Sequence, residues 1–157
     1  MRAGGLVAIP TETVYGLAAD ATNPEAVARI YSAKGRPAFN PLIAHFPDAQ
    51  AALDEGLFDA SALSLATHFW PGPLTLVVPV TGNTRCCELA RAGLDSVALR
   101  VPSHPVAQAF MRLTGCPLAA PSANRSGHVS PTNAGHVLAD LDGMIDAVLD
   151  GGPCGLG

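Results

Sequence analysis

The chain has 157 residues, of which 48% are hydrophobic and 14% are charged, and its formal net charge is −4. This composition excludes a disordered segment and predicts one globular domain with a substantial core. The net negative charge argues against a protein that coats nucleic acids in general, because such a protein would be basic. It does not exclude a local basic pocket.

The first predicted strand lies in residues 4–10, where a short apolar run is bounded by glycine and proline. Residues 11–17 are predicted to form a loop that leaves the end of this strand and is rich in hydroxyl groups. Ligands of open α/β sheets bind outside the carboxyl ends of strands, so this loop is a candidate for ligand binding. The alternative is a threonine-rich turn that satisfies its own backbone.

A helix is predicted to follow this loop. Asn23 is a favoured cap, Pro24 suits the first helical position, and Glu25 faces the positive end of the helix dipole. Apolar residues then recur at helical spacing, and the helix is expected to end near Gly35.

Residues 34–45 place two cations, an amide and an imidazole within one short stretch, as Lys34, Arg36, Asn40 and His45. A glycine and two prolines interrupt this stretch, which predicts a helix end, a rigid loop and a strand over residues 42–46. A loop held by prolines suits an anion, because ordering its polar groups costs less entropy on binding. The alternative is a helix end whose cations offset the C-terminal dipole.

Two helices are predicted next, one opening at residues 47–48 and one over residues 59–69. The buried face of the second is expected to hold Leu63, Ala66 and either Phe69 or Trp70. The Trp-Pro-Gly-Pro sequence that follows stops this helix, and Trp70 is predicted to anchor the core. Residues 74–80 form the strongest predicted strand, and residues 82–95 lack periodicity and are predicted to be a loop.

A short strand is predicted over residues 97–102, and it carries Arg100 within an apolar pattern. This arginine is either an edge residue in water or a cation of a site. Ser103 is predicted to cap a helix over residues 104–114. The inward face of that helix is expected to hold Val106, Ala109, Phe110 and Leu113.

The last part of the chain is predicted to alternate again between strand and helix. A buried strand over residues 116–121 leads to a loop, residues 121–132, whose serines, asparagine and arginine are potential donors to phosphate oxygens. Thr132 is predicted to cap a helix that runs to Leu141, and residues 145–149 form the last strand. The order βαβααββαβαβ predicts a single α/β domain over residues 1–157, with a twisted, mixed, open sheet flanked by helices.

The cysteines and histidines show no metal-binding spacing. The four cysteines include no Cys-x-x-Cys pair, and adjacent Cys86 and Cys87 are a poor disulfide framework, which predicts reduced thiols in a cytoplasmic protein. The five histidines contain no His-Glu-x-x-His, so no metal site is predicted. No membrane span or signal peptide is predicted either, because the apolar runs are too short.

The polar clusters at the strand ends share cations and neutral donors with few acids, which suits a site that stabilises transferring phosphate. Four motifs, in this order, resemble the Sua5/YrdC/YciO family, and the resemblance covers nearly the whole chain. They are Pro10-Thr11-Glu12-Thr13-Val14-Tyr15-Gly16-Leu17, then Lys34-x-Arg36-Pro37 with Asn40-Pro41-Leu42, then Pro71-Gly72-Pro73-Leu74-Thr75, and then Ser122-Ala123-Asn124-x-Ser126-Gly127 with Ser130-Pro131-Thr132.

The resemblance implies a YrdC-like fold and a threonylcarbamoyl-AMP synthase. Members of the family join L-threonine, bicarbonate or CO2, and ATP into threonylcarbamoyl-adenylate and pyrophosphate. A separate tRNA threonylcarbamoyltransferase then uses that product to modify adenosine 37 of tRNA, the t6A modification. ATP would carry Mg²⁺, and no tightly bound cofactor is implied.

The resemblance also implies roles for individual residues of this chain. L-threonine would be held by Thr13, His45, Arg100 and Ala120. ATP would contact Arg36, Asn40, Ser96, Ser122, Asn124 and Ser130. Lys34 and Arg36 would be the catalytic cations, and Lys34 would face either the phosphates or the carboxylating carbon.

The chain departs from the family pattern at both ends. Family members continue past the Gly-Gly turn into a Glu-Ser-Thr-Val-Val-Asp strand and a later arginine that contribute to ligand binding, whereas this sequence stops at Gly157. It also starts directly at the first motif strand, without the usual preceding helix. The expectation is a domain truncated at its C-terminus, with an exposed edge at a missing central strand and an open pocket.

Two other functions remain as alternatives. The first is an RNA-binding or regulatory module that keeps the fold and lacks synthase activity, in which Lys34, Arg36, Arg100 and Arg125 would serve RNA. A weak tRNA contact is compatible with either function, and no membrane partner is expected. The second is a related carbamoyl-transfer enzyme, since similar domains occur inside larger carbamoyltransferases.

Overall fold

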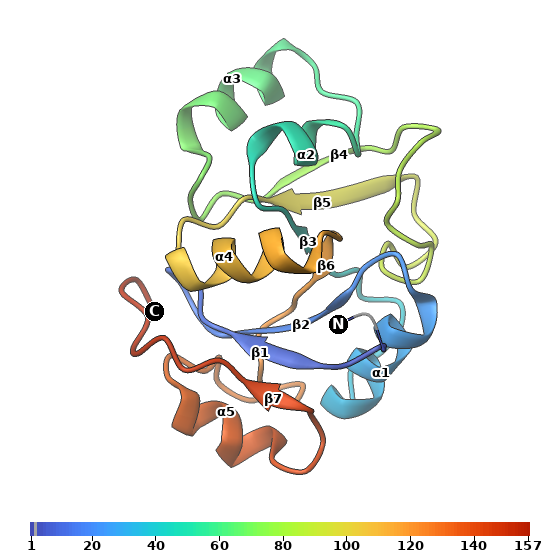
Figure 1. Cartoon of the computed structure of the whole chain (residues 1–157). Coiled ribbons are helices and arrows are strands. Elements are labelled where there is room, and N and C mark those ends of the chain that lie inside the picture. Colours follow the sequence, from blue (N-terminus) through green and yellow to red (C-terminus); the bar gives the residue numbers. More distant parts are fainter. Residues whose placement is uncertain (2) are drawn as a thin grey trace.

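The computed structural model describes residues 1 and 3–157. Seven strands form one mixed sheet in the order β4-β5-β3-β6-β2-β1-β7, with five helices around it (Figure 1). The strands are β1 Val7–Ile9, β2 Gly16–Asp20, β3 Ile43–His45, β4 Leu76–Pro79, β5 Ser96–Arg100, β6 Leu118–Ala119 and β7 Ala147–Val148. The helices are α1 Pro24–Lys34, α2 Ala49–Leu53, α3 Ala60–Phe69, α4 Pro105–Thr114 and α5 Ala134–Leu141. The predicted α/β class and mixed sheet are confirmed.

Strand β2 is the one element that the sequence did not reveal. It pairs antiparallel with β1, with Ile9 opposite Gly16, and with β6 on its other side. Its sequence, Gly-Leu-Ala-Ala-Asp, lacks the β-branched and aromatic residues that mark strands. Its pairing on both sides and its burial therefore decide its conformation, and the predicted loop shortens to residues 11–15.

The sheet is continuous, because every strand except β4 and β7 is hydrogen-bonded on both sides. Its two edges are β4 and β7, and the predicted C-terminal truncation with a missing central strand stays a prediction. Strands β3 and β5 run parallel, as do β1 and β7, and the other neighbours are antiparallel.

The two faces of the sheet are covered differently. On one face α4 packs through Ala107 and Met111 against a cluster that includes Ile9, Ala18 and Leu118. On the other face, the strand residues that point away from α4 pack against α1 and other apolar segments in a larger cluster. Figure 1 shows α4 lying across only part of the sheet.

The ends of α1 are as predicted. The Asn23 side chain accepts hydrogen bonds from the backbone N–H groups of Glu25 and Ala26, at 2.9 and 3.2 Å. Gly35 ends the helix in the left-handed conformation, with φ of 59°, which glycine adopts at little cost. These caps fix where Lys34 leaves the helix.

Two predicted caps are wrong by one residue. His104, not Ser103, caps α4, because its Nδ1 accepts from the backbone N–H of Val106 at 3.2 Å. Asn133, not Thr132, caps α5, because its side chain accepts from the backbone N–H of His136 at 2.9 Å. In both cases the preceding residue also has an oxygen that suits a cap, so the sequence alone leaves the position ambiguous.

Two predicted helix faces are right only in part: Ala66 and Trp70 are buried as predicted for α3, and Phe110 packs against the core as predicted for α4, but other predicted positions are exposed. In α4 the fully buried residues are Ala107 and Met111, whereas Ala109 and Leu113 are exposed, Leu113 by 80%. In α3 only Ala66 is buried, and Leu63 and Phe69 are more than 40% exposed. Both helices have apolar residues on several sides, so periodicity does not select one face.

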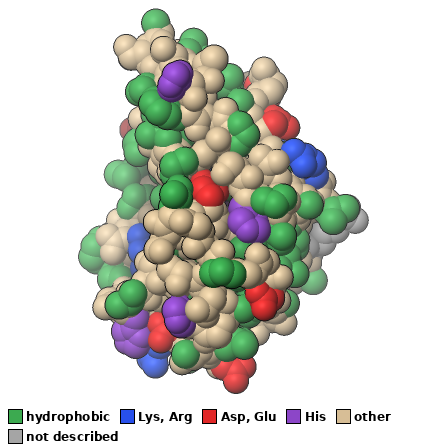
Figure 2. Space-filling view, turned by 90° about the vertical axis from the view of Figure 1, so that its left-hand side faces the viewer, with side chains coloured by type: hydrophobic (Ala, Val, Ile, Leu, Met, Phe, Trp, Pro, Cys, Tyr) green, Lys and Arg blue, Asp and Glu red, His purple; other side chains and the backbone are tan. Residues whose placement is uncertain are grey.

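Other predictions for the scaffold are confirmed. Trp70 is 7% exposed and donates its indole N–H to the carbonyl of Leu74 at 2.7 Å, which makes it a core anchor. All four cysteines are free thiols. Among the described residues, no helix is long and apolar enough to cross a membrane. On the side of the molecule drawn in Figure 2, Lys and Arg side chains are few and lie apart from one another.

Candidate functional site

A cavity of about 250 Å³ opens on the α4 face of the sheet, between the loop of residues 11–15 and strands β3, β5 and β6. Its floor is the sheet itself, because Ile43 and His45 are alternate residues of β3 and point to the same side. The wall consists of Thr11, Val14, Gly16, Ile43, His45, Arg100, Ala120, Pro121 and Ser122. Four residues predicted for the site, His45, Arg100, Ala120 and Ser122, therefore meet in one cavity.

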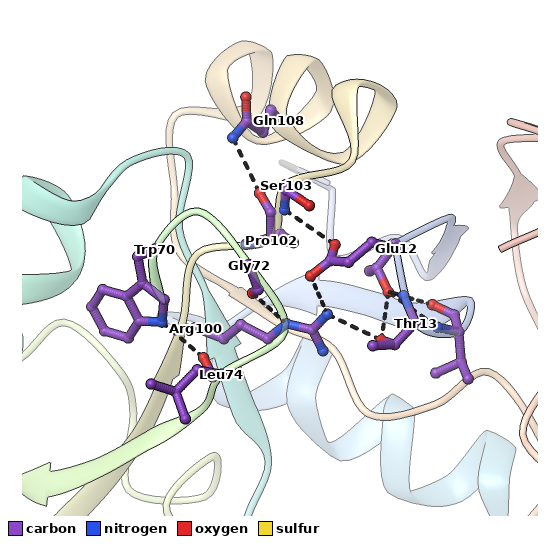
Figure 3. Close-up of polar contacts among 11 residues, drawn as sticks. Glu12, Thr13, Trp70, Gly72, Leu74, Arg100, Pro102, Ser103 and Gln108 are labelled. Carbon is purple, nitrogen blue, oxygen red and sulfur yellow. Dashed lines mark hydrogen bonds and ion pairs between the residues drawn. The ribbon is translucent and has the colours of Figure 1, made fainter. Parts of the chain in front are cut away.

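Arg100 is the main cation of this cavity. Its Nε donates to the carbonyl of Gly72 at 3.3 Å, and its Nη2 donates to Glu12 Oε1 at 2.6 Å and to Thr13 Oγ1 at 3.0 Å (Figure 3). Strand β5 lies inside the sheet, and the Arg100 side chain is only 9% exposed. Of the two possibilities left open by the sequence, an edge residue in water is excluded, and a cation that serves a site stays a prediction.

Glu12 is a functional candidate that the sequence reasoning missed. Its second oxygen, Oε2, accepts from the backbone N–H of Ser103 at 3.1 Å, and its side chain is 13% exposed. Burial by itself raises the pKa of Glu12, but the hydrogen bond and the charge of Arg100, together with backbone N–H donors, outweigh it and hold the pKa below its ordinary value. The expectation of a site with few acids overlooked this ion pair.

The two threonines beside Glu12 have different hydrogen-bond partners. Thr11 Oγ1 donates to the carbonyl of Val14 at 2.7 Å and accepts from the N–H groups of Thr13 and Val14, both at 3.2 Å. This is the self-satisfying turn that was the alternative prediction for the loop. Thr13 Oγ1 instead accepts from Arg100 and lies 3.0 Å from Thr11 Oγ1, and Thr13 itself is not among the residues of the cavity wall.

His45 lies fully buried at the end of β3, with Nδ1 3.1 Å from the carbonyl of Ile43. Burial, and then the positive charge of Arg100, lower its pKa to about 4. The ring is therefore neutral at pH 7, and it offers the cavity a dipole and a hydrogen-bonding nitrogen without a second charge.

The buried His45 predicts a loss of stability in acid. The unfolded chain takes up a proton near pH 6.5, whereas the folded chain does so only near pH 4, so stability falls as the pH drops through this window. A shift of this size corresponds to about 3 kcal/mol of unfolding free energy. Urea unfolding at pH 7, 5.5 and 4.5 should show this loss for the wild type and a flatter dependence for His45→Asn. Equal pH dependences would contradict the assignment.

Lys34 lies behind the cavity wall. It is 2% exposed, and its Nζ donates to the backbone carbonyls of Ser122, at 2.6 Å, and of Asn124. Burial, and then the charge of Arg36, lower the pKa of Lys34 to about 8. Because Ser122 lines the cavity, Lys34 positions that part of the wall.

Asn124 shapes the loop that follows Ser122. Its amide nitrogen donates to the carbonyls of Arg125 and His128 at 2.7 and 2.8 Å. Its Oδ1 is buried and has no hydrogen-bond partner among the described residues. The side chain therefore holds residues 124–128 in place while one acceptor remains available.

The other residues predicted for ATP lie outside the cavity wall. Arg36 donates back to its own loop, to the carbonyls of Asn40 at 3.4 Å and Pro41 at 3.2 Å. Ser96 is the first residue of β5. Ser130 lines a neighbouring hollow of about 500 Å³, together with Gly127, His128, Val129, His136, Ala139 and Asp140. The structure thus groups the residues predicted for threonine more closely than those predicted for ATP.

Comparison with known proteins identifies the family of this chain. The model of the Sua5/YciO/YrdC family, described as "Telomere recombination", matches residues 1–157. Threonylcarbamoyl-AMP synthase of Bacillus subtilis (strain 168) is 51% identical over 158 residues, covering 100% of this chain and 45% of the relative. The enzyme of the same name from Vibrio cholerae is 35% identical over 154 residues, covering 96% of this chain and 81% of the relative.

A solved structure agrees with these sequence matches. Pyrococcus abyssi Sua5, crystallised in complex with L-threonine, superposes with a TM-score of 0.92 at 48% identity, over 97% of this chain and 44% of that one. The chain spans about half the length of the Bacillus and Pyrococcus relatives. The family model over the whole chain and these relatives show that the chain belongs to the Sua5/YciO/YrdC family.

Proposed function

We propose that this chain carries threonylcarbamoyl-AMP synthase activity, joining L-threonine, bicarbonate or CO2, and ATP into threonylcarbamoyl-adenylate and pyrophosphate. The observation that carries the proposal is Arg100, a cation in the wall of a small cavity beside neutral His45, whose Nη1 has no hydrogen-bond partner among the described residues. The printed names of the relatives, and the threonine complex of one of them, support the same substrate.

The cavity suits the carboxylate and the side chain of a small amino acid. Arg100 would donate to the carboxylate, as guanidinium groups commonly do. Thr13 and His45 add a hydroxyl and a neutral imidazole within the same group of residues. Ala120 keeps the opposite wall small and apolar, which favours a substrate no larger than threonine.

The proposed reaction has two steps. The deprotonated amine of threonine attacks the carbon of CO2, a C–N bond forms, and the amine loses a second proton to give a carbamate. A carbamate oxygen then attacks the α-phosphorus of ATP in line, and the bond from that phosphorus to the bridging oxygen breaks, so that pyrophosphate leaves with the electron pair. Holding the reactants together supplies much of the rate through orientation.

Negative charge develops on the phosphate oxygens during the second step. Lys34, through the N–H that its two backbone carbonyls leave over, and Arg36, after exchanging backbone carbonyls for phosphate oxygens, would stabilise it. Mg²⁺ would arrive with ATP, whose phosphates are its usual ligands. Asn40, Ser96, Ser122, Asn124 and Ser130 would bind the nucleotide around this centre.

A second enzyme has to use the product, threonylcarbamoyl-adenylate. We assign that role to a separate tRNA threonylcarbamoyltransferase that modifies adenosine 37, and we place the reaction in the cytoplasm, where the four free thiols would persist.

The distribution of cations favours this proposal over an RNA-binding module. Arg100 is paired with a buried carboxylate, and Lys34 is buried against backbone carbonyls. Of the four cations that the alternative requires, only Arg125 is fully exposed, and Arg36 is partly covered. Lys and Arg side chains form no patch on the side drawn in Figure 2.

The test is pyrophosphate release from ATP by the purified chain, with and without L-threonine and bicarbonate, and without tRNA. Release that requires both co-substrates is the expected result. RNA binding that weakens steeply with salt, without response to threonine, would instead support the binding module. A folded chain that releases no pyrophosphate, even with the C-terminal extension of a family member added, would overturn the proposal.

A further inference from the structure

We infer that Glu12 is a positioning residue for the carboxylate site: it orients Arg100 so that Nη1 faces the cavity and remains available to a substrate carboxylate. The inference rests on the proposed function, because it takes Arg100 as the group that binds the carboxylate of threonine. Glu12 itself is not part of the cavity wall, so it acts through Arg100.

The orientation of the guanidinium follows from its planarity. Gly72 holds Nε from one side, and Glu12 and Thr13 hold Nη2 from another, so two of the three nitrogens have fixed partners. Because the three nitrogens share one rigid plane, fixing two of them also fixes the direction of the third. In Figure 3 the remaining terminal nitrogen carries no dashed line, and among the described residues it has no hydrogen-bond partner.

Glu12 can orient Arg100 because Glu12 is itself held. Its Oε2 accepts from the backbone N–H of Ser103, just before α4, and its backbone belongs to the turn that Thr11 closes. One carboxylate thus joins the loop over the cavity, the end of β5 and the start of α4. Of the anchors of Arg100, only Glu12 is charged, and its contact at 2.6 Å is the shortest.

The charge balance supports the same role. Glu12 compensates the charge of Arg100 through Nη2 and leaves Nη1 uncontacted, so the protein need not bury an unpaired cation. The opposite role is conceivable on electrostatic grounds alone, because a resident carboxylate also repels an incoming one. The two roles differ in the sign of the effect that removal of the Glu12 charge has on threonine affinity.

The experiment measures the binding of L-threonine and of ATP, each by calorimetry, to the full chain and to Glu12→Gln. Glutamine keeps the shape but turns one of the two oxygens into an N–H2 donor, so it cannot accept from both Ser103 and Arg100. We expect the Kd for threonine to rise at least tenfold, while the Kd for ATP stays within twofold. Should E12Q fail to fold, Glu12→Asp tests the orientation alone: it keeps the charge but is one methylene shorter, so it cannot reach Ser103 and Arg100 together, and the same rise in the Kd for threonine with an unchanged Kd for ATP is expected.

Glu55→Gln is the matched control. Glu55 is 1% exposed and is bound to Arg85 Nε at 2.7 Å, with its second oxygen accepting from the Arg85 backbone N–H and from Thr84, and it does not line the cavity. This variant should leave both affinities unchanged. Unchanged or tighter threonine binding by E12Q would overturn the inference, as would equal losses for both ligands. A wild type that binds neither ligand would overturn the proposed function and this inference with it.

Discussion

Replacing Arg100 with methionine is expected to lower the free energy of unfolding by about 3–5 kcal/mol at pH 7, because the change leaves Glu12 as a buried charge without its partner. The two side chains are 9% and 13% exposed and their charged atoms lie 2.6 Å apart, so water cannot replace the arginine fully. The variant should also lose detectable binding of L-threonine. Urea unfolding and calorimetry measure the two effects separately.

The double variant Arg100→Met with Glu12→Gln separates stability from function. Removing the lone carboxylate should restore most of the lost stability, since no unpaired charge remains. Threonine binding should stay absent, because the donor is still missing. A single variant that is as stable as the wild type would contradict the buried pair, and one that binds threonine normally would contradict the assignment of Arg100.

The fold could be predicted from the sequence wherever a local signal was strong. The cap at Asn23 and the glycine that ends α1 are such signals, because each satisfies backbone groups at a helix end. Strand β2 could not be predicted, since its small residues become a strand only through pairing with β1 and β6. The inward face of α4 was missed in part for a related reason: the tertiary contacts, not the apolar pattern, select Ala107 and Met111.

For the candidate site too, the sequence predicted some residues and missed others. The sequence motifs named His45, Arg100, Ala120 and Ser122, and the sheet brings these distant residues to one cavity. Glu12 stood inside the first motif, but nothing in its spacing disclosed a partner 88 residues away. An acid between two threonines, in a chain with an otherwise isolated strand arginine, was the only signal that could have suggested the pair.

Lys34 supplies the second large expected effect. Two of its three N–H groups are engaged by the carbonyls of Ser122 and Asn124, which leaves one for a phosphate oxygen. Lys34→Met should lower the rate of pyrophosphate release by about 10²–10³-fold, the usual effect of losing one donor that stabilises transition-state charge. A thermal melt of the variant establishes that it remains folded, since the same change leaves two carbonyl groups without this donor.

The pH dependence of ATP binding decides whether the Lys34 cation binds phosphate or only positions the cavity wall. The pKa of Lys34 is lowered to about 8, so the folded protein loses this cation as the pH rises above that value. If the cation meets phosphate, the Kd for ATP should rise above pH 8, approaching about tenfold per pH unit as the lysine becomes neutral. The Lys34→Met variant should bind ATP more weakly and without this dependence. Parallel profiles for the two proteins would show that Lys34 holds the carbonyls of Ser122 and Asn124 and does not touch the nucleotide.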